Sequence, residues 1–141
     1  MSQYKRLIFT SNLVNEYGRD LPELLNESIN RNTSLGISSI LLSSHGKLIQ
    51  LIEGNANLVN QLWQRIRQDA RYFDQRVVAE DMLDAQTFVG THASLGRYAL
   101  LNPEELQEKI QVFPLITQEI EQRLPVSGAR KYLTNFISEH A

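Results

Sequence analysis

An amide side chain inside an apolar segment is the first feature of this sequence that points to chemistry. Gln50 interrupts the apolar run 48–52, in what should be one of the most buried strands of the protein. A buried amide without a hydrogen-bond partner costs roughly 1–3 kcal/mol. Gln50 therefore needs a partner, unless it lies on an edge strand and faces water. The apolar neighbours and a second amide upstream, Asn32, weaken the edge-strand interpretation.

The other polar residues give little support to a catalytic or metal site. The spacing of His45, His92 and His140 matches no metal-binding pattern, and the chain has no cysteine. No serine stands in a nucleophile elbow, and no glycine cluster forms a phosphate loop. The adjacent acids at 80–81 and 104–105 resemble ordinary solvated surface pairs. We therefore expect a protein that is not an enzyme.

Composition favours a globular protein with no nucleic-acid or membrane partner. The chain has 141 residues, of which 42% are hydrophobic and 21% charged, and its formal net charge is −2. This length suggests one domain with a small appendage. No basic run suggests nucleic acid as the partner, and no apolar run has the length of a signal peptide or a membrane span. We expect a cytoplasmic protein.

Periodicity and turn residues predict the elements of an α+β domain. Residues 20–23 carry a capping box with proline in the first turn, which predicts a helix that ends near 30–32. The segment 56–70 has an apolar stripe at helical spacing. The remaining predictions are a strand at 6–10, a loop at 11–19, hairpin strands at 37–42 and 47–53, a turn at 71–75, and weaker strands at 76–81 and 87–97.

This order of elements predicts a ferredoxin-like fold. Both hairpin strands are almost continuously apolar, which is typical of a sheet centre that is covered on both faces. Strand, helix, two strands, helix and two strands give the ferredoxin-like pattern with one additional strand. We expect five strands in one sheet and two helices packed on one of its faces, because each helix has one apolar stripe to bury.

The composition changes after residue 101, where a helical tail begins. A capping box with proline at the first helical position opens it at 102–105, and Pro114 and Pro125 interrupt it. Short helices are predicted at 115–124 and over the amphipathic segment 129–137. The tail must pack on the open face of the sheet or on another subunit. We divide the chain into a domain at 1–101 and a C-terminal helical extension at 102–141.

At the hairpin the sequence resembles the BLUF family of flavin-binding blue-light sensors. The run from Asn32 to Gly54, with GISSILL and LIQLIEG, resembles the asparagine, first strand and glutamine-containing second strand of the family signature. RLIF at 6–9 resembles the family's Arg-Leu-Ile-Tyr. The segment 59–72 resembles a family helix that ends in Asp-x-Arg-His. The resemblance covers roughly residues 4–100 and implies the same fold as the pattern of elements.

The resemblance implies a binding site for FAD. Asn32 matches the asparagine at the flavin C4 carbonyl, and Gln50 matches the glutamine that rearranges beside the ring in the light-driven switch. An isoalloxazine ring needs a flat apolar slot with donors at its carbonyl edge, which would give both amides partners. The implied cofactor-binding residues are Leu24, Asn32, Gln50, Ile66, Asp69 and Arg71.

The sequence departs from the family at the positions of the photochemical relay. Phe9 replaces the tyrosine that gives an electron and a proton to the excited flavin, and phenylalanine has no O–H. Thr91 and Ala93 stand where the family has tryptophan and methionine. Tyr72 replaces the usual histidine. We therefore expect a flavin-binding protein whose blue-light photocycle is impaired or lost.

Three functional hypotheses follow. The first is a BLUF-type sensory or regulatory protein that binds FAD and signals through protein contacts. Its partner would be a response regulator or a transcriptional or signalling protein, and it would form homo-oligomers like the short BLUF proteins. The second is a flavin-free adaptor that keeps only the fold. The third is a small hydrolase of the acylphosphatase type. That chemistry requires a phosphate-cradling loop, and none is visible in this sequence.

Overall fold

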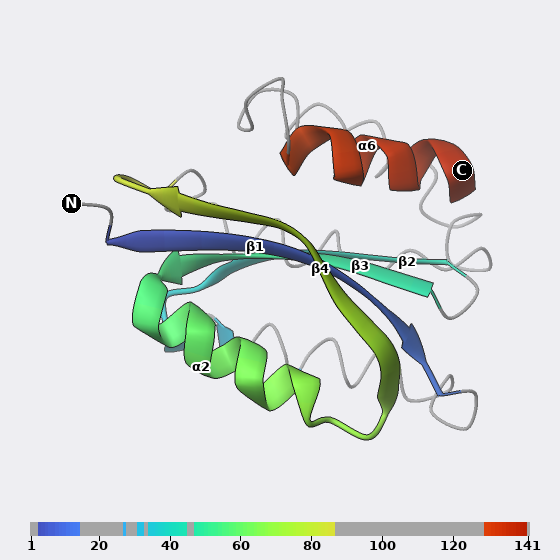
Figure 1. The fold of residues 1–141 in the computed structure, drawn as a ribbon, viewed down its shortest axis with the longest axis horizontal. Coiled ribbons are helices and arrows are strands. Elements are labelled where there is room, and N and C mark those ends of the chain that lie inside the picture. The colour runs from blue at the N-terminus through green and yellow to red at the C-terminus, as the bar shows by residue number, and fades with distance from the viewer. Residues whose placement is uncertain are drawn as a thin grey trace.

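A computed structural model describes residues 3–14, 27, 31–32, 34–44, 47–86 and 129–140. These residues form an α+β fold with a four-stranded sheet and two helices (Figure 1). The elements are β1 (Tyr4–Leu13), β2 (Ser38–Ser44), β3 (Lys47–Asn55), α2 (Ala56–Arg67), β4 (Tyr72–Leu83) and α6 (Ala129–His140).

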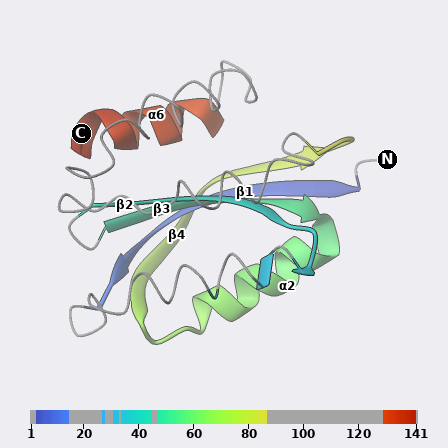
Figure 2. The same ribbon diagram turned by 180° about the vertical axis from the view of Figure 1, so that it is seen from behind.

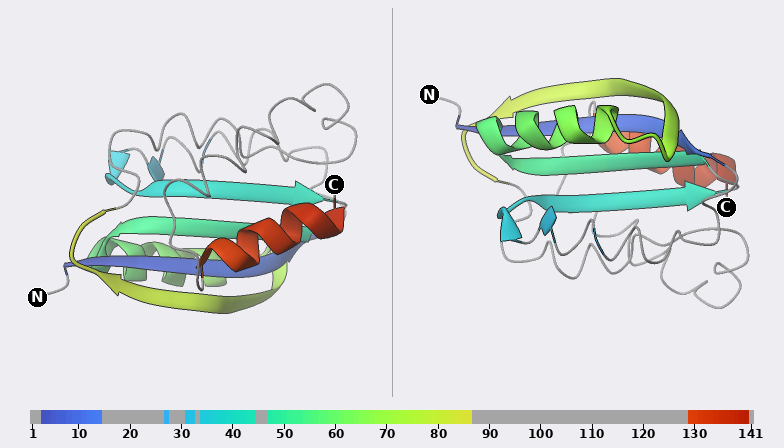
Figure 3. Two further views of the ribbon diagram at one scale, coloured as in Figure 1. Left: turned by 90° about the horizontal axis from the view of Figure 1, so that it is seen from above. Right: turned by 90° about the horizontal axis from the view of Figure 1, so that it is seen from below.

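The four strands lie in the order β2-β3-β1-β4, and each neighbouring pair is antiparallel (Figure 3). β3 and β1 are therefore interior strands, and seven consecutive residues of β3 are buried. This confirms the prediction that the second hairpin strand is covered on both faces. The fifth strand, predicted at 87–97, lies outside the described residues.

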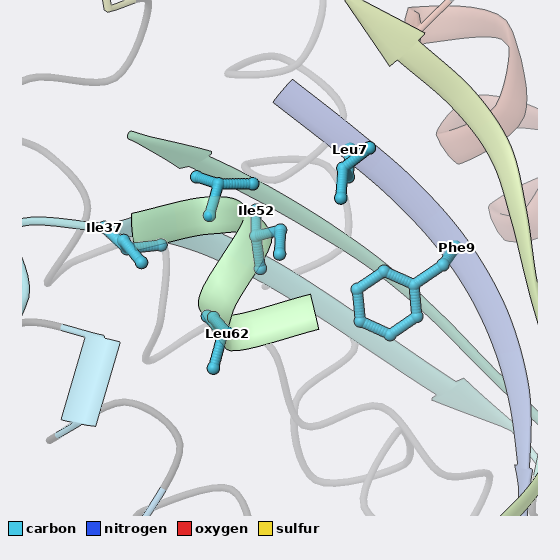
Figure 4. Packing of buried hydrophobic residues seen from close by; sticks show 6 residues of the cluster. Leu7, Phe9, Ile37, Ile52 and Leu62 are labelled. Carbon is cyan, nitrogen blue, oxygen red and sulfur yellow. The ribbon is translucent and has the colours of Figure 1, made fainter. Parts of the chain in front are cut away.

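α2 covers one face of the sheet, and its sequence explains how it begins and what it buries. The side chain of Asn55 accepts hydrogen bonds from the backbone N–H groups of Asn57 and Leu58 and so caps the first turn. Val59 and Leu62 then pack against the sheet, in one cluster with side chains from β1 and β3 (Figure 4). The stripe predicted from helical spacing is thus the buried face of α2.

α6 lies on the opposite face of the sheet (Figures 1 and 2). Its Leu133 is fully buried, and the helix contacts β2. Ile8 of β1 and Leu51 of β3 are also completely buried. The amphipathic segment predicted at 129–137 therefore packs on the open face of its own sheet, one of the two alternatives left by the sequence. The other predicted tail helices and their prolines lie outside the described residues.

Three predicted boundaries are wrong, and hydrogen bonding explains the differences. β1 continues to Leu13 instead of ending at residue 10, because β4 pairs with it along this length. α2 ends at Arg67, where the N–H of Gln68 bonds back to the last turn, so that Ala70 is exposed in the turn. The segment 71–75 was predicted as a turn, but β4 already begins at Tyr72.

Two further predictions can be compared with the structure only in part, because it does not describe all the residues that they concern. Of the helix predicted from residue 20 to about 30–32, only positions 27, 31 and 32 are described, and all three are helical. Ser34, which lies beyond the predicted end, is helical as well. Among the helices that the structure describes, none combines the length and the apolar character needed to span a membrane.

Candidate binding cavity

A cavity of about 370 Å³ opens between the sheet and the C-terminal end of α2. Its volume lies in the range of small-molecule and cofactor sites. Its lining side chains come from the sheet, from the end of α2 and the turn after it, and from the helical residues before β2. They are Phe9, Ser11, Glu27, Arg31, Leu48, Gln50, Arg65, Ile66, Gln68, Asp69, Ala70, Arg71 and Tyr72.

Gln50 reaches the cavity from the centre of the sheet. It lies directly opposite Phe9 in the β1–β3 register, and both side chains face α2 because directions alternate along a strand. The ring of Phe9 packs on that of Trp63, with the centroids 4.7 Å apart. Gln50 is only 9% exposed and lies on an interior strand. The edge-strand interpretation of Gln50 is therefore wrong.

Asp69 and Arg71 form a tight ion pair at the end of α2. Asp69 accepts hydrogen bonds from the backbone N–H of Arg71 at 3.0 Å and from its guanidinium at 2.6–3.1 Å. The guanidinium holds the pKa of the Asp69 carboxyl below its ordinary value, and the carboxylate raises the pKa of Arg71. Glu27 lies 3.7 Å from Arg71 on its exposed side. The contacts with Asp69 therefore hold the guanidinium of Arg71 in a fixed position in the cavity lining.

Burial shifts the pKa values of two further groups around the cavity. Burial raises the pKa of the Tyr72 phenol, because the charged phenolate is poorly solvated there. Burial and the nearby charge of Arg65 lower the pKa of the Arg31 guanidinium. The Nε of Arg31 is buried and has no hydrogen-bond partner within the described structure. One guanidinium beside the cavity thus keeps a donor that no described residue satisfies.

Asn32 is the most deeply buried amide side chain near this site. It is 1% exposed, and neither its Oδ1 nor its Nδ2 has a hydrogen-bond partner in the described part of the chain. Its backbone carbonyl accepts from the N–H groups of Leu35 and Ile37, which fixes the turn into β2. Gly36 makes this turn with a φ of 67°, a conformation that favours glycine.

The structure brings together four of the six residues that the resemblance assigns to the cofactor. Gln50, Ile66, Asp69 and Arg71 all line the cavity. Asn32 is buried beside Arg31 in the sequence but is not among the lining residues. Leu24 lies outside the described residues, as do Thr91 and Ala93 of the photochemical relay. The cofactor role of these six residues stays a prediction.

Sequence reasoning missed several of the lining residues. Ser11 was placed in a loop, although it lies two residues after Phe9 and so on the same face of an extended β1. Arg65 lies in a helical segment of which only the apolar stripe was predicted, and Tyr72 was noted only as the residue that replaces the family's histidine. Arg31 was not singled out, although it precedes Asn32. Nothing in the local sequence shows that these side chains meet at one cavity.

The cavity lining combines apolar and polar side chains. Phe9, Leu48 and Ile66 supply apolar wall, while Gln50 and the guanidinium of Arg71 supply polar groups. A flat aromatic ligand with carbonyl groups along an edge matches such a site. Among the described residues, no group of three or more histidines, aspartates or glutamates could hold a metal ion.

Comparison with known families identifies the domain. The sequence profile of the BLUF family, described as sensors of blue-light using FAD, matches residues 4–93. The chain belongs to the BLUF family. The resemblance drawn from the hairpin and the end of α2 is thus confirmed, and the BLUF match extends through all four described strands and α2. No curated protein matches the chain.

Solved BLUF structures share this fold. The structure named BlrP1 BLUF is 27% identical, with a TM-score of 0.57 over 64% of this chain and 62% of its own. Klebsiella pneumoniae BlrP1 with FMN and cyclic diGMP is 24% identical, with a TM-score of 0.66 over 96% of this chain and 34% of its own. The BLUF protein BlrB, in its dark state, is 23% identical, with a TM-score of 0.59 over 80% of this chain and 96% of its own. This BLUF chain thus spans about a third of the larger BlrP1 structure.

Proposed function

We propose that the cavity binds the isoalloxazine ring of FAD and that this BLUF protein is a sensory or regulatory protein, not an enzyme. The observation that carries the proposal is the orphaned amide of Asn32, 1% exposed and without a partner for either polar atom in the described structure. A buried group of this kind is costly unless a ligand satisfies it. Gln50 and Arg71 offer polar groups in the cavity lining, to which Arg31, the residue before Asn32, also belongs.

The lining residues fit a flavin. Phe9, Leu48 and Ile66 would contact the faces of the ring, and Asn32, Gln50 and Arg71 would bond its carbonyl edge. Asn32 is not among the lining residues, so its amide would have to move to reach the ring. When bound, the flavin would supply a ring that absorbs blue light and can accept electrons. Asp69 would hold Arg71 in place through its bidentate contact.

We further propose that the photocycle of the family is impaired or lost in this chain. Phe9 packs on Trp63 and faces Gln50 across the strand pair, so the β1 residue opposite Gln50 has neither a phenol proton nor an easily oxidised ring. Thr91 and Ala93, which replace the tryptophan and methionine of the family, add to this expectation.

The absorption spectrum of the purified protein tests the binding proposal. We expect the near-ultraviolet and blue bands of a flavin, and release of FAD on denaturation. The matched variant Gln50→Leu should bind flavin more weakly, while Gln61→Leu, on the exposed side of α2, should not. A colourless wild-type protein that takes up no added flavin would favour the flavin-free adaptor instead.

The variant Phe9→Tyr tests the proposed loss of the photocycle. In flavin-loaded samples we expect no light-induced red shift of the flavin bands for the wild type and a measurable shift for Phe9→Tyr. Phe73→Tyr is the control, because Phe73 is 54% exposed on β4 and does not line the cavity. A red shift in the wild type would contradict the proposal, and the hydroxyl of Tyr72 would then be the first alternative donor to test.

We propose that output passes through protein contacts. The partner class that the resemblance implies is a response regulator or a transcriptional or signalling protein, and self-association into homo-oligomers is expected. The helical extension at 102–141 is proposed as a separate part of the chain that contributes to these contacts. Light scattering on the purified protein tests self-association, and a monomer at all concentrations would contradict it.

A further inference from the structure

A buried ion pair joins the two interior strands on the face of the sheet opposite the cavity. Arg6 of β1 lies directly opposite Glu53 of β3, with 3.4 Å between a guanidinium nitrogen and a carboxylate oxygen. Both side chains are almost completely buried. They face away from α2, because Leu7, the residue after Arg6, packs in the cluster under that helix and side-chain directions alternate along a strand. Neither residue of the pair lines the cavity.

The apolar residues of β1 and β3 do not by themselves fix how these two strands are aligned. Both strands carry apolar runs, at 7–9 and, apart from Gln50, at 48–52. If β1 slipped along β3 by two residues, every side chain would keep its face of the sheet. Phe9 would then lie opposite Leu48, and Ile8 opposite Ile49. Apolar packing would be retained, so another feature must select the observed register.

The neighbouring strands do not select this register either. The pairing of β1 with β4 is irregular at two places, between Ile8 and Phe9 and between Thr10 and Asn12. β2 is separated from β1 by β3. Residues 14–46 lie between β1 and β3 in the chain, so no short turn sets the alignment of the two strands.

The ion pair distinguishes between the alignments. After a two-residue slip in one direction, Arg6 would lie opposite Leu51 and Glu53 opposite Tyr4. After a slip in the other direction, Glu53 would lie opposite Ile8. Each slip separates two buried charges from each other, which is strongly unfavourable. Buried polar groups are known to specify register in this way even where they add little stability.

We propose that Arg6 and Glu53 are positioning residues whose pairing sets the register of β1 on β3 and so aligns the cavity lining on the other face of the sheet. In this register Phe9 lies opposite Gln50, and both line the cavity. A two-residue slip would displace Gln50 by about 7 Å along β1. The inference concerns the sheet and stands whether or not the cavity binds a flavin.

Cross-strand disulfides report the register, because the chain has no cysteine of its own. Lys47→Cys is combined with Asn12→Cys for the observed register, and with Thr10→Cys or Val14→Cys for the two slips. All four positions are at least partly exposed. With the ion pair intact, we expect the disulfide between positions 12 and 47 to form about tenfold faster than the other two, since diagonal neighbours are too far apart to be bridged.

The double variant Arg6→Met with Glu53→Leu removes the pair. Replacing both charges of a buried pair by apolar side chains leaves a protein folded, whereas removing one charge does not spare the other. Asp81, the second partner of Arg6, has a side chain that is 45% exposed, so water can solvate it. We expect the tenfold preference for the disulfide between positions 12 and 47 to disappear, because several registers are then populated.

Lys5→Met with Glu80→Leu is the matched control. It removes an ion pair that also joins β1 to a neighbouring strand, but the side chain of Glu80 is 55% exposed. The preference for the disulfide between positions 12 and 47 should remain about tenfold in this control, because an exposed pair leaves no buried charge when the strands slip.

Binding of added FAD gives a second measurement. The variant without the Arg6–Glu53 pair should bind FAD severalfold more weakly, and closing the disulfide between positions 12 and 47 in it should restore the affinity. A change in stability alone would not give this rescue in a folded protein. If no variant and no wild-type sample bound FAD, the proposed flavin site would be rejected, while the disulfide rates would still decide the question of register.

Three results would overturn the inference. An unchanged preference in the variant without the pair would mean that apolar packing sets the register. Equal rates of the three disulfides with the pair intact would mean that the register is not fixed at all. An unfolded double variant, detected by circular dichroism, would mean that the pair is required for folding and not for alignment alone.

Discussion

The two faces of the central strands differ in the buried polar groups that they carry. On the face covered by α6, Arg6 of β1 lies opposite Glu53 of β3, and their side chains are 4% and 0% exposed. Arg6 also reaches Asp81 of β4, at 3.5 Å. On the face covered by α2, the corresponding polar position is Gln50, opposite Phe9. There the amide borders a cavity, and no buried charge pair accompanies it.

This difference suggests two roles for buried polar groups in this BLUF protein, one in stabilising the fold and one in binding a ligand. On the α6 face the charged groups Arg6 and Glu53 pair with each other, so we infer that they hold the sheet together, although Ser38 Oγ on the same face has no partner among the described residues. Polar groups around the cavity, above all Asn32 and Arg31, keep buried atoms without partners among the described residues. Removing a paired group should therefore cost stability, whereas removing an unpaired one should increase it and weaken ligand binding.

The largest expected effect is on the α6 face. Glu53→Gln keeps the side-chain volume but removes the buried charge that lies 3.4 Å from the guanidinium of Arg6. We expect the free energy of unfolding to fall by about 3 kcal/mol, because a buried charge loses its main counterion. Urea denaturation of the flavin-free protein measures this change.

Glu80→Gln is the matched control for that substitution. Glu80 is also a strand carboxylate paired with a basic residue of β1, Lys5, but its side chain is 55% exposed. Its loss should cost at most about 0.5 kcal/mol. If the two variants proved equally stable, the buried pair would not be the stabilising contact that the structure suggests.

A smaller effect of opposite sign is expected at Asn32. Asn32→Leu replaces two polar atoms that have no partner among the described residues by apolar ones of similar volume, so the flavin-free protein should gain about 1–2 kcal/mol of stability. The same variant should bind FAD more weakly. Asn57→Leu, at an exposed helical position, should change neither quantity appreciably. A loss of stability in Asn32→Leu would show that the amide has a partner in the flavin-free protein.

The smallest expected effect is the pH dependence of the Asp69–Arg71 pair. Because the folded pKa of Asp69 is depressed below its ordinary value of 3.8, the pair stabilises the fold above that pH. The contribution is lost as the pH falls through the folded pKa. Asp69→Asn should cost about 1 kcal/mol at neutral pH, and its difference from the wild type should vanish in acid.

Denaturation curves measured from neutral to acidic pH check this prediction. Asp74→Asn is the control, because Asp74 pairs with Arg76 at the surface, and asparagine tolerates the positive φ of 52° at this position. A constant difference between Asp69→Asn and the wild type at every pH would mean that the ion pair is not the source of the effect.

Much of this fold could be predicted because its signals are local. Continuous apolar runs on both sides of a short turn identified β2 and β3, and helical spacing identified α2 and α6. The predicted ends of strands were wrong where hydrogen bonds to a strand distant in the sequence determine them. Leu13 and Tyr72 belong to strands because β1 and β4 hydrogen-bond to each other, and neither segment shows this pairing in its own sequence.

The sequence by itself determined that Gln50 is an amide in a buried strand and that the chain resembles BLUF domains, because apolar patterning and collinear motifs are properties of neighbouring residues. Only the tertiary structure decided which side chains meet. Strand register placed Phe9 opposite Gln50, and packing of α2 brought Arg65 and Arg71 to the cavity that Arg31 enters. The tertiary structure also decided which polar atoms have partners, because burial and pairing depend on residues that are far apart in the chain.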